Sequence, residues 1–366
     1  MSEYQYYEWQ TLDRPLTPEE RSVVNALSSH IDVTSTRAQV DYSWGNFKHA
    51  PIHVLVGFFD AFLYSSNWGE RHLAFRFPTG LLDEAALQPY LWAESIELTR
   101  FADHVVLEII CNDEEGDEWI DDEESLSTLA PLRAALLAED YRMLYLAWLM
   151  IATLAGEDEA LEPPVPLGLG ALTTSLSALI EFFGLDPFLV EAAAQSSETH
   201  TVEPAMALST LIERLTRAEC NDYLQRLASD EALLSLKLNR RLRELGGQTV
   251  APAAAAPSRT LLQLKEAAAA LDRADSERQR VEAAARRKQE LQDFAAKAPH
   301  AWIEIDKMME KKSGSAYDAA VALLVNLRDL AVMQNNLSAF TEQLARVQAQ
   351  YSGRRAFMER LREEFG

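Results

Sequence analysis

Cysteine is scarce in this chain, with two residues, Cys111 and Cys220, among 366. They lie far apart and form no CxxC pair, which excludes a cysteine-based structural zinc site and a disulfide framework. Isolated cysteines of this kind are typical of buried, reduced thiols in a cytosolic protein. We therefore expect a cytoplasmic location.

Long apolar runs are also missing. The most hydrophobic stretch, residues 143–155, is shorter than the ~20 residues that a helix needs to cross a bilayer. A buried core helix is the better interpretation, and no membrane partner is expected. The first residues, MSEYQYY, contain neither a basic segment nor an apolar one, so we expect no signal peptide.

Positive charge is in short supply over the first two thirds of the chain. Residues 1–245 hold 16 Lys/Arg against 41 Asp/Glu, a net charge of −25, whereas residues 246–366 hold 18 against 16, a net charge of +2. The excess peaks at residues 113–124, DEEGDEWIDDEE, where nine of twelve residues are acidic. Such a surface repels nucleic acid and attracts basic partners, so direct nucleic-acid binding is not expected.

Motifs that would name a reaction or a cofactor are absent. No GxSxG sequence supports a hydrolase serine. Residues 168–170 (GLG) resemble a fragment of a phosphate-binding loop, but they follow a proline-rich link, and Thr173 occupies the third glycine position. A helix cap at Thr173, Thr174 or Ser175 explains this segment adequately. We expect no cofactor, and no catalytic residue is assigned.

What the sequence does contain predicts an α+β protein, in which an N-terminal mixed-sheet domain precedes an all-helical bundle, a long helix and a small C-terminal helical cap. The expected sheet has about five strands, at residues 4–10, 33–42, 71–77, 96–100 and 104–111. Thr17, Pro18 and Glu20 have the spacing of a capping box at a helix start, and an apolar helix is expected over residues 52–63.

Helical patterns alone follow the acidic run. We expect one or two helices over residues 126–154 with an interruption near Pro131, a helix at 172–183, another after Asp186, and two or three within 204–245. The predicted domains are the α+β domain at 1–125 with acidic loop 113–124, the bundle at 126–245, a linker at 246–258, a long charged helix at 259–298 and a C-terminal helical domain at 299–366.

The long helix, residues 261–298, contains no glycine or proline, and its apolar seam is thin. The seam consists of Leu264, Leu271, Val281, Leu291 and Phe294. A long exposed helix is favoured over a sustained coiled coil, although residues 259–298 are the candidate for self-association. Three to four further helices are expected to form the cap.

The segments SEYQYYE, DRPL, YSWGNFK, YDAAVALL and LRDLA together resemble an uncharacterised bacterial protein family of similar length. The closing helices also resemble the tails of bacterial SWIM zinc-finger proteins. The CxC…CxH metal motif of those proteins has no counterpart here, because Cys111 and Cys220 cannot supply it. Neither resemblance implies an activity or a site residue for this chain.

The acidic run is the candidate partner-binding site, and its apolar pair is the expected anchor within the charge. The residues concerned are Asp117, Glu118, Trp119, Ile120, Asp121 and Asp122. A solvated loop between sheet and bundle is the simpler interpretation, and cation binding is a third one, although the EF-hand spacing fails. His49 and His53 are candidate metal ligands because they would share a helix face if the helix began before Pro51.

Six of the seven tryptophans fall before residue 150, where they are expected mainly to fill a core. The Trp44-Gly45 and Trp68-Gly69 turns are a further candidate, because they could shape a groove for a peptide or protein. The sequence as a whole favours a non-enzymatic interaction or scaffold protein whose acidic body binds a basic protein surface. The alternatives are a metal-assisted enzyme in the α+β domain and an acidic DNA mimic.

Overall fold

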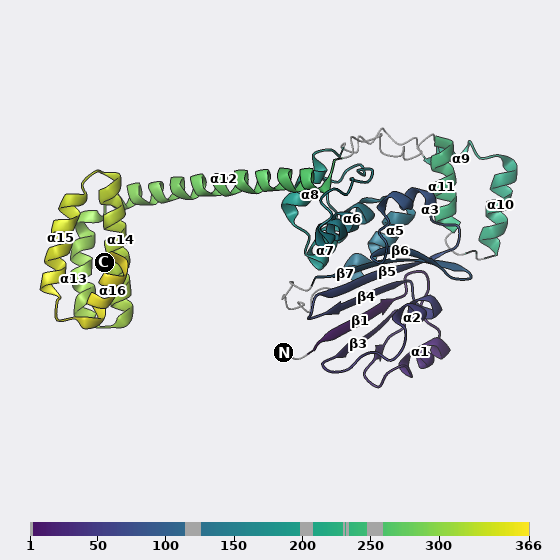
Figure 1. The fold of residues 1–366 in the computed structure, drawn as a ribbon, viewed down its shortest axis with the longest axis horizontal. Coiled ribbons are helices and arrows are strands. Elements are labelled where there is room, and N and C mark those ends of the chain that lie inside the picture. Colours follow the sequence, from purple (N-terminus) through teal and green to yellow (C-terminus); the bar gives the residue numbers. More distant parts are fainter. Residues whose placement is uncertain are drawn as a thin grey trace. The chain divides into compact units, whose positions relative to one another are not determined.

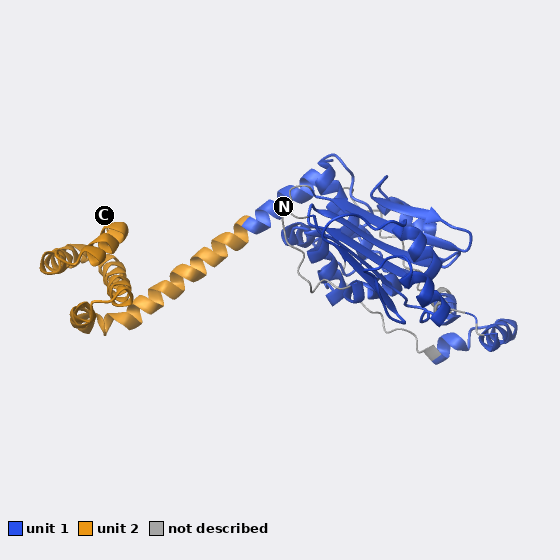
Figure 2. Cartoon of the chain, turned by 90° about the horizontal axis from the view of Figure 1, so that it is seen from below, with its two compact units in different colours: residues 1–272 blue, residues 273–366 orange. Residues whose placement is uncertain are grey.

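A computed structural model describes residues 3–113, 126–197, 208–229, 231, 234–246 and 259–365. The chain divides into two compact units, unit 1 at Met1–Asp272 and unit 2 at Arg273–Gly366 (Figures 1 and 2). The α+β class predicted from the sequence is confirmed: unit 1 contains a sheet with helices, and helices alone follow it.

The sheet of unit 1 has seven described strands in the order β2-β3-β1-β4-β5-β7-β6. The strands are β1 (Gln5–Gln10), β2 (Asp32–Val33), β3 (Arg37–Tyr42), β4 (Ala61–Ser66), β5 (Glu70–Pro78), β6 (Ile96–Arg100) and β7 (His104–Asn112). Every pair is antiparallel, so the expectation of a mixed sheet with about five strands was wrong. Short turns join β4 to β5 and β6 to β7, whereas a parallel pair needs a long crossover connection.

Alternate residues of these strands face two separate hydrophobic cores. On one face the sheet packs against helices that follow residue 125, and on the other against α1 and α2 (Figure 1). Adjacent residues divide between the cores, as in the pairs Phe62 and Leu63, Ala74 and Phe75, and Val106 and Leu107. The central strands are therefore buried on both sides.

Helix α1 (Pro18–Asn25) begins at the predicted capping box, in which Thr17 and Glu20 each accept a backbone N–H of the other. Helix α2 (Pro51–Phe58) is shorter than the predicted 52–63 helix, because residues 61–63 belong to β4. Between β5 and β6 lie α3 (Glu84–Leu87) and the 3₁₀ helix η1 (Gln88–Tyr90).

Residues 126–155 form three helices rather than one or two: α4 (Leu126–Leu129), α5 (Pro131–Leu137) and α6 (Arg142–Ala155). Pro131 opens α5 as expected, and a second break occurs where Glu139 adopts a φ of 65°. Helices α7 (Thr174–Phe183) and α8 (Pro187–Ala194) begin at the caps Thr173 and Asp186, as predicted.

The helices that follow residue 125 share one core with the sheet. Side chains of β4, β5 and β7 pack with those of α4 to α8 in a single cluster. Three further helices of unit 1 are α9 (Leu208–Ile212), α10 (Arg217–Ala228) and α11 (Leu234–Gly246). The predicted boundary at residue 125 therefore separates two kinds of secondary structure that pack together within one unit. Most of the predicted linker, residues 247–258, lies outside the described residues.

Helix α12 (Leu261–Ala295) begins in unit 1 and continues into unit 2. Its first turn is held by backbone hydrogen bonds from Glu162 to Arg259 (2.8 Å) and from Leu261 to Ala160 (3.0 Å). Leu261 and Leu264 are fully buried in the core of unit 1.

Unit 2 contains the rest of α12 with α13 (Ala298–Lys311), α14 (Gly314–Met333), α15 (Leu337–Gln350) and α16 (Arg355–Phe365). These four helices are the small helical group that the sequence predicted. They enclose a core of their own that includes Ile305, Leu324 and Phe357, each fully buried.

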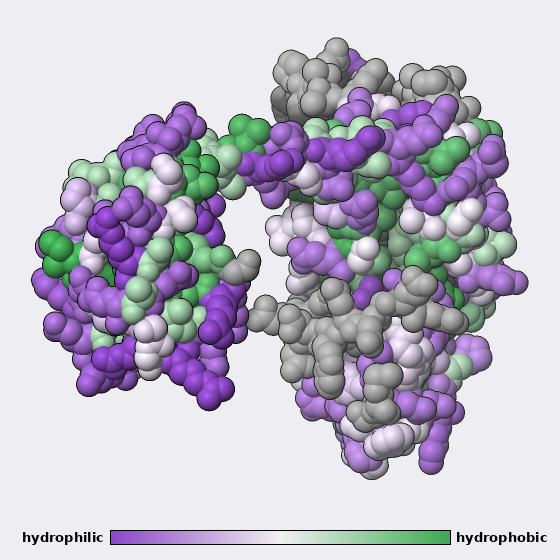
Figure 3. All heavy atoms as spheres, turned by 60° about the vertical axis from the view of Figure 1, so that its left-hand side comes forward, coloured by the Kyte–Doolittle hydropathy of each residue, from purple (hydrophilic) through white to green (hydrophobic). Residues whose placement is uncertain are grey.

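The face drawn in Figure 3 is mostly hydrophilic and is broken by smaller hydrophobic areas. No helix among the described residues combines the length and apolar character that a bilayer crossing requires.

Candidate functional site

Two tryptophan-containing turns flank the start of β1. The Gln5 side chain donates a hydrogen bond to the Gly45 carbonyl (2.9 Å), which holds the Trp44-Gly45 turn. On the opposite side, Tyr4 and Asn67 exchange hydrogen bonds of 2.9 and 3.0 Å, which hold the turn before Trp68. We call the surface formed by Trp44 and Trp68 the tryptophan end of the sheet.

The tryptophan end is exposed. Trp44 is 70% accessible and Trp68 is 39% accessible, whereas Trp9 and Trp148 are buried. The expectation that tryptophans fill the core therefore holds for some of them only. Exposed large aromatic side chains are typical of protein interaction surfaces.

The acidic run begins at this same end. Asp113, its first residue, donates its backbone N–H to the Gly69 carbonyl (3.1 Å). A Cβ atom at Gly69 would lie 1.8 Å from the Asp113 carbonyl oxygen, so only glycine permits this approach. At the other end of the segment, the Leu126 N–H donates to the buried carboxylate of Glu8 on β1 (3.0 Å). Both ends are thus fixed to the sheet.

The candidate partner-binding residues themselves, Asp117, Glu118, Trp119, Ile120, Asp121 and Asp122, lie outside the described residues. Their role stays a prediction.

The candidate metal ligands His49 and His53 do not share a helix face, because α2 begins at Pro51. Both side chains are exposed; His49 contacts the Phe47 ring, and His53 contacts the Phe101 ring. Within the described ranges, no group of three or more His, Cys, Asp or Glu side chains is placed to hold a metal ion.

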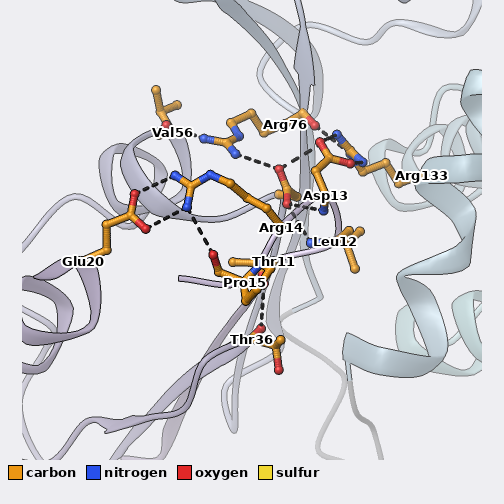
Figure 4. Close-up of polar contacts among 11 residues, drawn as sticks. Thr11, Leu12, Asp13, Arg14, Pro15, Glu20, Thr36, Val56, Arg76 and Arg133 are labelled. Atoms are coloured by element: carbon orange, nitrogen blue, oxygen red, sulfur yellow. Dashed lines mark hydrogen bonds and ion pairs between the residues drawn. The ribbon is translucent and has the colours of Figure 1, made fainter. Parts of the chain in front are cut away.

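A buried charge network joins the loop after β1 to β5 and α5 (Figure 4). The Asp60 carboxylate, at the start of β4, accepts hydrogen bonds from the N–H groups of Leu12 (2.6 Å) and Asp13 (3.0 Å). It also accepts one from the Arg76 guanidinium (2.7 Å). Arg133 binds both carboxylate oxygens of Asp13 at 2.8 Å and donates to the Arg76 carbonyl at 2.8 Å.

The charged groups of this network already bind one another. Burial alone would raise the pKa of the Asp60 carboxyl, but the hydrogen bonds from Asp13, Leu12 and Arg76 outweigh it and hold that pKa below its usual value. An ionised carboxylate whose oxygens already accept several donors is a poor proton acceptor for catalysis. The network therefore has a structural role, because it links the loop after β1 to β5 and α5. No local sequence pattern predicts this network, because Asp13 and Arg133 are 120 residues apart.

A second buried group lies where α12 begins. Glu162 accepts hydrogen bonds from the Tyr145 hydroxyl and from Arg259, whose Nε and Nη2 atoms lie 2.8 and 2.7 Å from the carboxylate. Arg259 also donates to the Ala192 carbonyl (3.1 Å). Burial is the main cause that raises the pKa of Tyr145, and the negative charge of Glu162 raises it further, so this tyrosine stays protonated. The group anchors the start of α12.

Two further candidates lack the features of an active site. A hollow of about 160 Å³ near the N-terminus of α7 is lined mainly by apolar side chains, and its carboxylate, Asp140, binds Arg142 (2.7 Å). In the GLG segment, the Gly168 carbonyl accepts a hydrogen bond from Arg142 (3.1 Å), and Thr173 caps α7. The Leu169 N–H donates to the Ser197 hydroxyl (2.9 Å) and the Ala171 N–H to the Gly168 carbonyl (3.0 Å), so these N–H groups do not form the cradle of a phosphate loop.

Comparisons with protein-family models, curated proteins and solved structures found no match. The resemblance to an uncharacterised bacterial family stays a prediction, and the functional argument rests on the chain's own residues.

Proposed function

We propose that this protein is a non-enzymatic interaction module whose unit 1 binds a basic, Lys/Arg-rich segment of another protein at the tryptophan end. One observation carries the proposal: the acidic run begins at Asp113, which is bonded to the turn that bears the exposed Trp68. Aromatic faces and carboxylates are therefore attached to the same end of the sheet.

The chemistry of this surface suits a cationic partner. An exposed tryptophan attracts a guanidinium or ammonium group through its ring face by about 0.5–1 kcal/mol. The carboxylates of residues 113–124 add attraction that speeds association and weakens as salt is added. Unit 1 holds 18 Lys/Arg against 43 Asp/Glu, a net charge of −25, so its wider field has the same sign.

Binding of the full-length chain to a synthetic Lys/Arg-rich peptide, measured by calorimetry at low salt, tests the proposal. We expect substitution of both Trp44 and Trp68 by alanine to weaken binding on the order of tenfold. A second variant neutralises Asp117, Glu118, Asp121 and Asp122 as Asn or Gln, and it should weaken binding by at least as much.

A matched control separates a site from general charge attraction. Changing Glu19, Glu157, Glu159 and Glu213 to glutamine alters the net charge equally at exposed positions elsewhere in unit 1. This control should bind like the wild type. The proposal fails if the control loses as much affinity as the acidic-run variant, or if the wild-type chain does not bind the peptide.

A further inference from the structure

A basic pocket interrupts the acidic surface of unit 1. It is a cavity of about 250 Å³ between the turn after β5 and helices α10 and α11. Its lining residues are Gly80, Leu81, Tyr223, Arg226, Lys237, Arg240 and Arg241. Four cationic side chains converge on one small cavity, although unit 1 as a whole carries a net charge of −25.

Three of these cations form ion pairs with carboxylates of residues that do not line the cavity. Arg226 binds Glu231 (2.6 Å) and Asp222 (3.2 Å), and Lys237 binds the same Glu231 (2.5 Å). Arg241 binds Glu219 (2.8 Å). Because Glu231 serves two cations, and none of the three carboxylate residues lines the cavity, the lining itself is cationic.

The fourth cation, Arg240, has no carboxylate partner in the described part of the chain. Its one hydrogen bond is a long one, 3.5 Å, to the Leu81 carbonyl across the cavity. A guanidinium offers five N–H donors in a planar fork, so most of those of Arg240 remain available to a ligand.

The neighbouring contacts fix the geometry of the pocket. The Arg226 guanidinium lies over the Tyr223 ring at 5.2 Å, and the Tyr223 hydroxyl donates to the Lys237 carbonyl (3.4 Å). The second contact joins α10 to α11, the two helices that supply the cationic side chains. Donors positioned in this way lose less conformational entropy when they bind a ligand.

We propose that the basic pocket binds a small molecule that carries a phosphate or diphosphate group. Guanidinium and ammonium groups together match the oxygens of a phosphate group. Pockets for drug-sized ligands are usually ~300–1,000 Å³, so a cavity of about 250 Å³ suits a smaller ligand or the phosphate-bearing end of one. A nucleic-acid strand is disfavoured, because the field around the pocket is negative.

Binding of inorganic pyrophosphate to the full-length chain, followed by calorimetry and by the ³¹P NMR signal of the ligand, tests this site. Arg240→Gln removes a cation that makes no ion pair with any described residue, so the fold should survive; its far-UV circular dichroism and melting temperature should match the wild type. We expect this variant to bind pyrophosphate at least tenfold more weakly. The matched control is Arg217→Gln, which removes an exposed arginine from α10 away from the pocket and should bind like the wild type.

Three results would overturn the proposal. The first is no binding of pyrophosphate to the wild-type chain at millimolar concentration. The second is an equal loss of affinity in the Arg240 and Arg217 variants, which indicates general charge attraction. The third is binding of a polyglutamate peptide that Arg240→Gln abolishes while pyrophosphate does not compete, which would assign the pocket to an acidic protein segment.

Discussion

At the scale of single residues, Asp60 illustrates how a buried charge is accommodated in this acidic chain. Its side chain is almost completely buried, and its oxygens accept hydrogen bonds from two backbone N–H groups and from Arg76. The Nη2 atom of Arg133 lies 3.9 Å from Oδ1 of Asp60. Burying a carboxylate is costly unless cations and hydrogen bonds compensate it. Removing the carboxylate leaves Arg76 without its carboxylate partner, whereas Arg133 keeps its two hydrogen bonds to Asp13.

We predict that Asp60→Asn lowers the free energy of unfolding by about 3–5 kcal/mol at neutral pH, because it leaves the Arg76 guanidinium without its carboxylate partner. The pKa of Asp60 is lowered by folding, so its contribution is complete above the ordinary aspartate value of about 3.9 and is lost as pH falls through the folded value. The difference between variant and wild type should therefore shrink in acid.

Urea unfolding at pH 7, 5 and 3 measures both effects. Asp41→Asn is the control, because Asp41 is exposed on β3, and its substitution should change stability by less than about 0.5 kcal/mol. If Asp60→Asn is no more destabilising than this control, the network does not stabilise the fold.

The residues that make up sites were the hardest to predict from the sequence. Composition located the acidic run, and the Trp-Gly pairs located two turns, yet their common place at one end of the sheet depends on the pairing of β1 with β3 and β4. The four cations of the basic pocket lie within residues 226–241, but the cavity that they line cannot be seen in the sequence, because Leu81 and Arg240 are 159 residues apart. Long-range contacts leave no local pattern.

At the scale of elements, the helix caps, which depend on neighbouring residues, are predicted correctly from the sequence, whereas a strand that is buried on both faces is not. The capping box at Thr17 and the caps at Thr173 and Asp186 act over three residues, so sequence spacing reveals them. The sequence pattern wrongly assigns the first residues of β4 to the end of a helix, because all six residues of this strand are buried. A strand buried on both faces shows no alternation and cannot be told from a helix by periodicity.

The turn between β4 and β5 provides a test at this scale. Gly69 has a φ of 92°, and Gly45 has a φ of 91°, but a Cβ at Gly45 would meet nothing within 4 Å. Gly45→Ala should therefore cost about 1–2 kcal/mol from backbone strain alone. Gly69→Ala should cost more, about 3–4 kcal/mol, because its Cβ also collides with the Asp113 carbonyl.

Chemical denaturation of the two variants separates these terms, since their difference isolates the collision. Equal destabilisation would mean that Asp113 moves away at no cost and that the start of the acidic run is not fixed to the turn.

The thin apolar seam of α12 does not form a continuous coiled-coil stripe. Leu264 and Leu271 pack in or against the core of unit 1, and Phe294 packs against that of unit 2. Leu291 is also buried, which leaves Val281 as the exposed member. A coiled coil needs apolar residues free along several heptads, so self-association through residues 259–298 draws no support from this arrangement.

At the scale of the whole molecule, the organisation is one of separate cores. The sheet, helices α1 to α8 and the start of α12 share the cores of unit 1, whereas unit 2 has its own. The predicted boundary at residue 125 lies where the type of secondary structure changes, and the one at residue 298 lies where the predicted long helix ends. Packing is decided by which apolar faces meet, and the helices after residue 125 bury theirs against the sheet.

The last prediction concerns the cooperativity of unfolding. Residues 276–286 of α12 are exposed and belong to none of the described cores, and each unit has a hydrophobic core of its own. We therefore expect two unfolding transitions. Ile305→Ala, a buried substitution in unit 2, should weaken one by about 2–5 kcal/mol, and Leu73→Ala in unit 1 should weaken the other by a similar amount.

The distribution of tryptophan makes the assignment direct. Trp302 is the single tryptophan of unit 2, so in a Trp302→Phe background the fluorescence reports unit 1 alone, while far-UV circular dichroism reports both units. Ile305→Ala should shift a transition that is seen by circular dichroism and is silent in fluorescence. Leu73→Ala should shift the fluorescent one. If either substitution moves both transitions together, the two units unfold as one cooperative body, and a module that binds through unit 1 would then also depend on the integrity of unit 2.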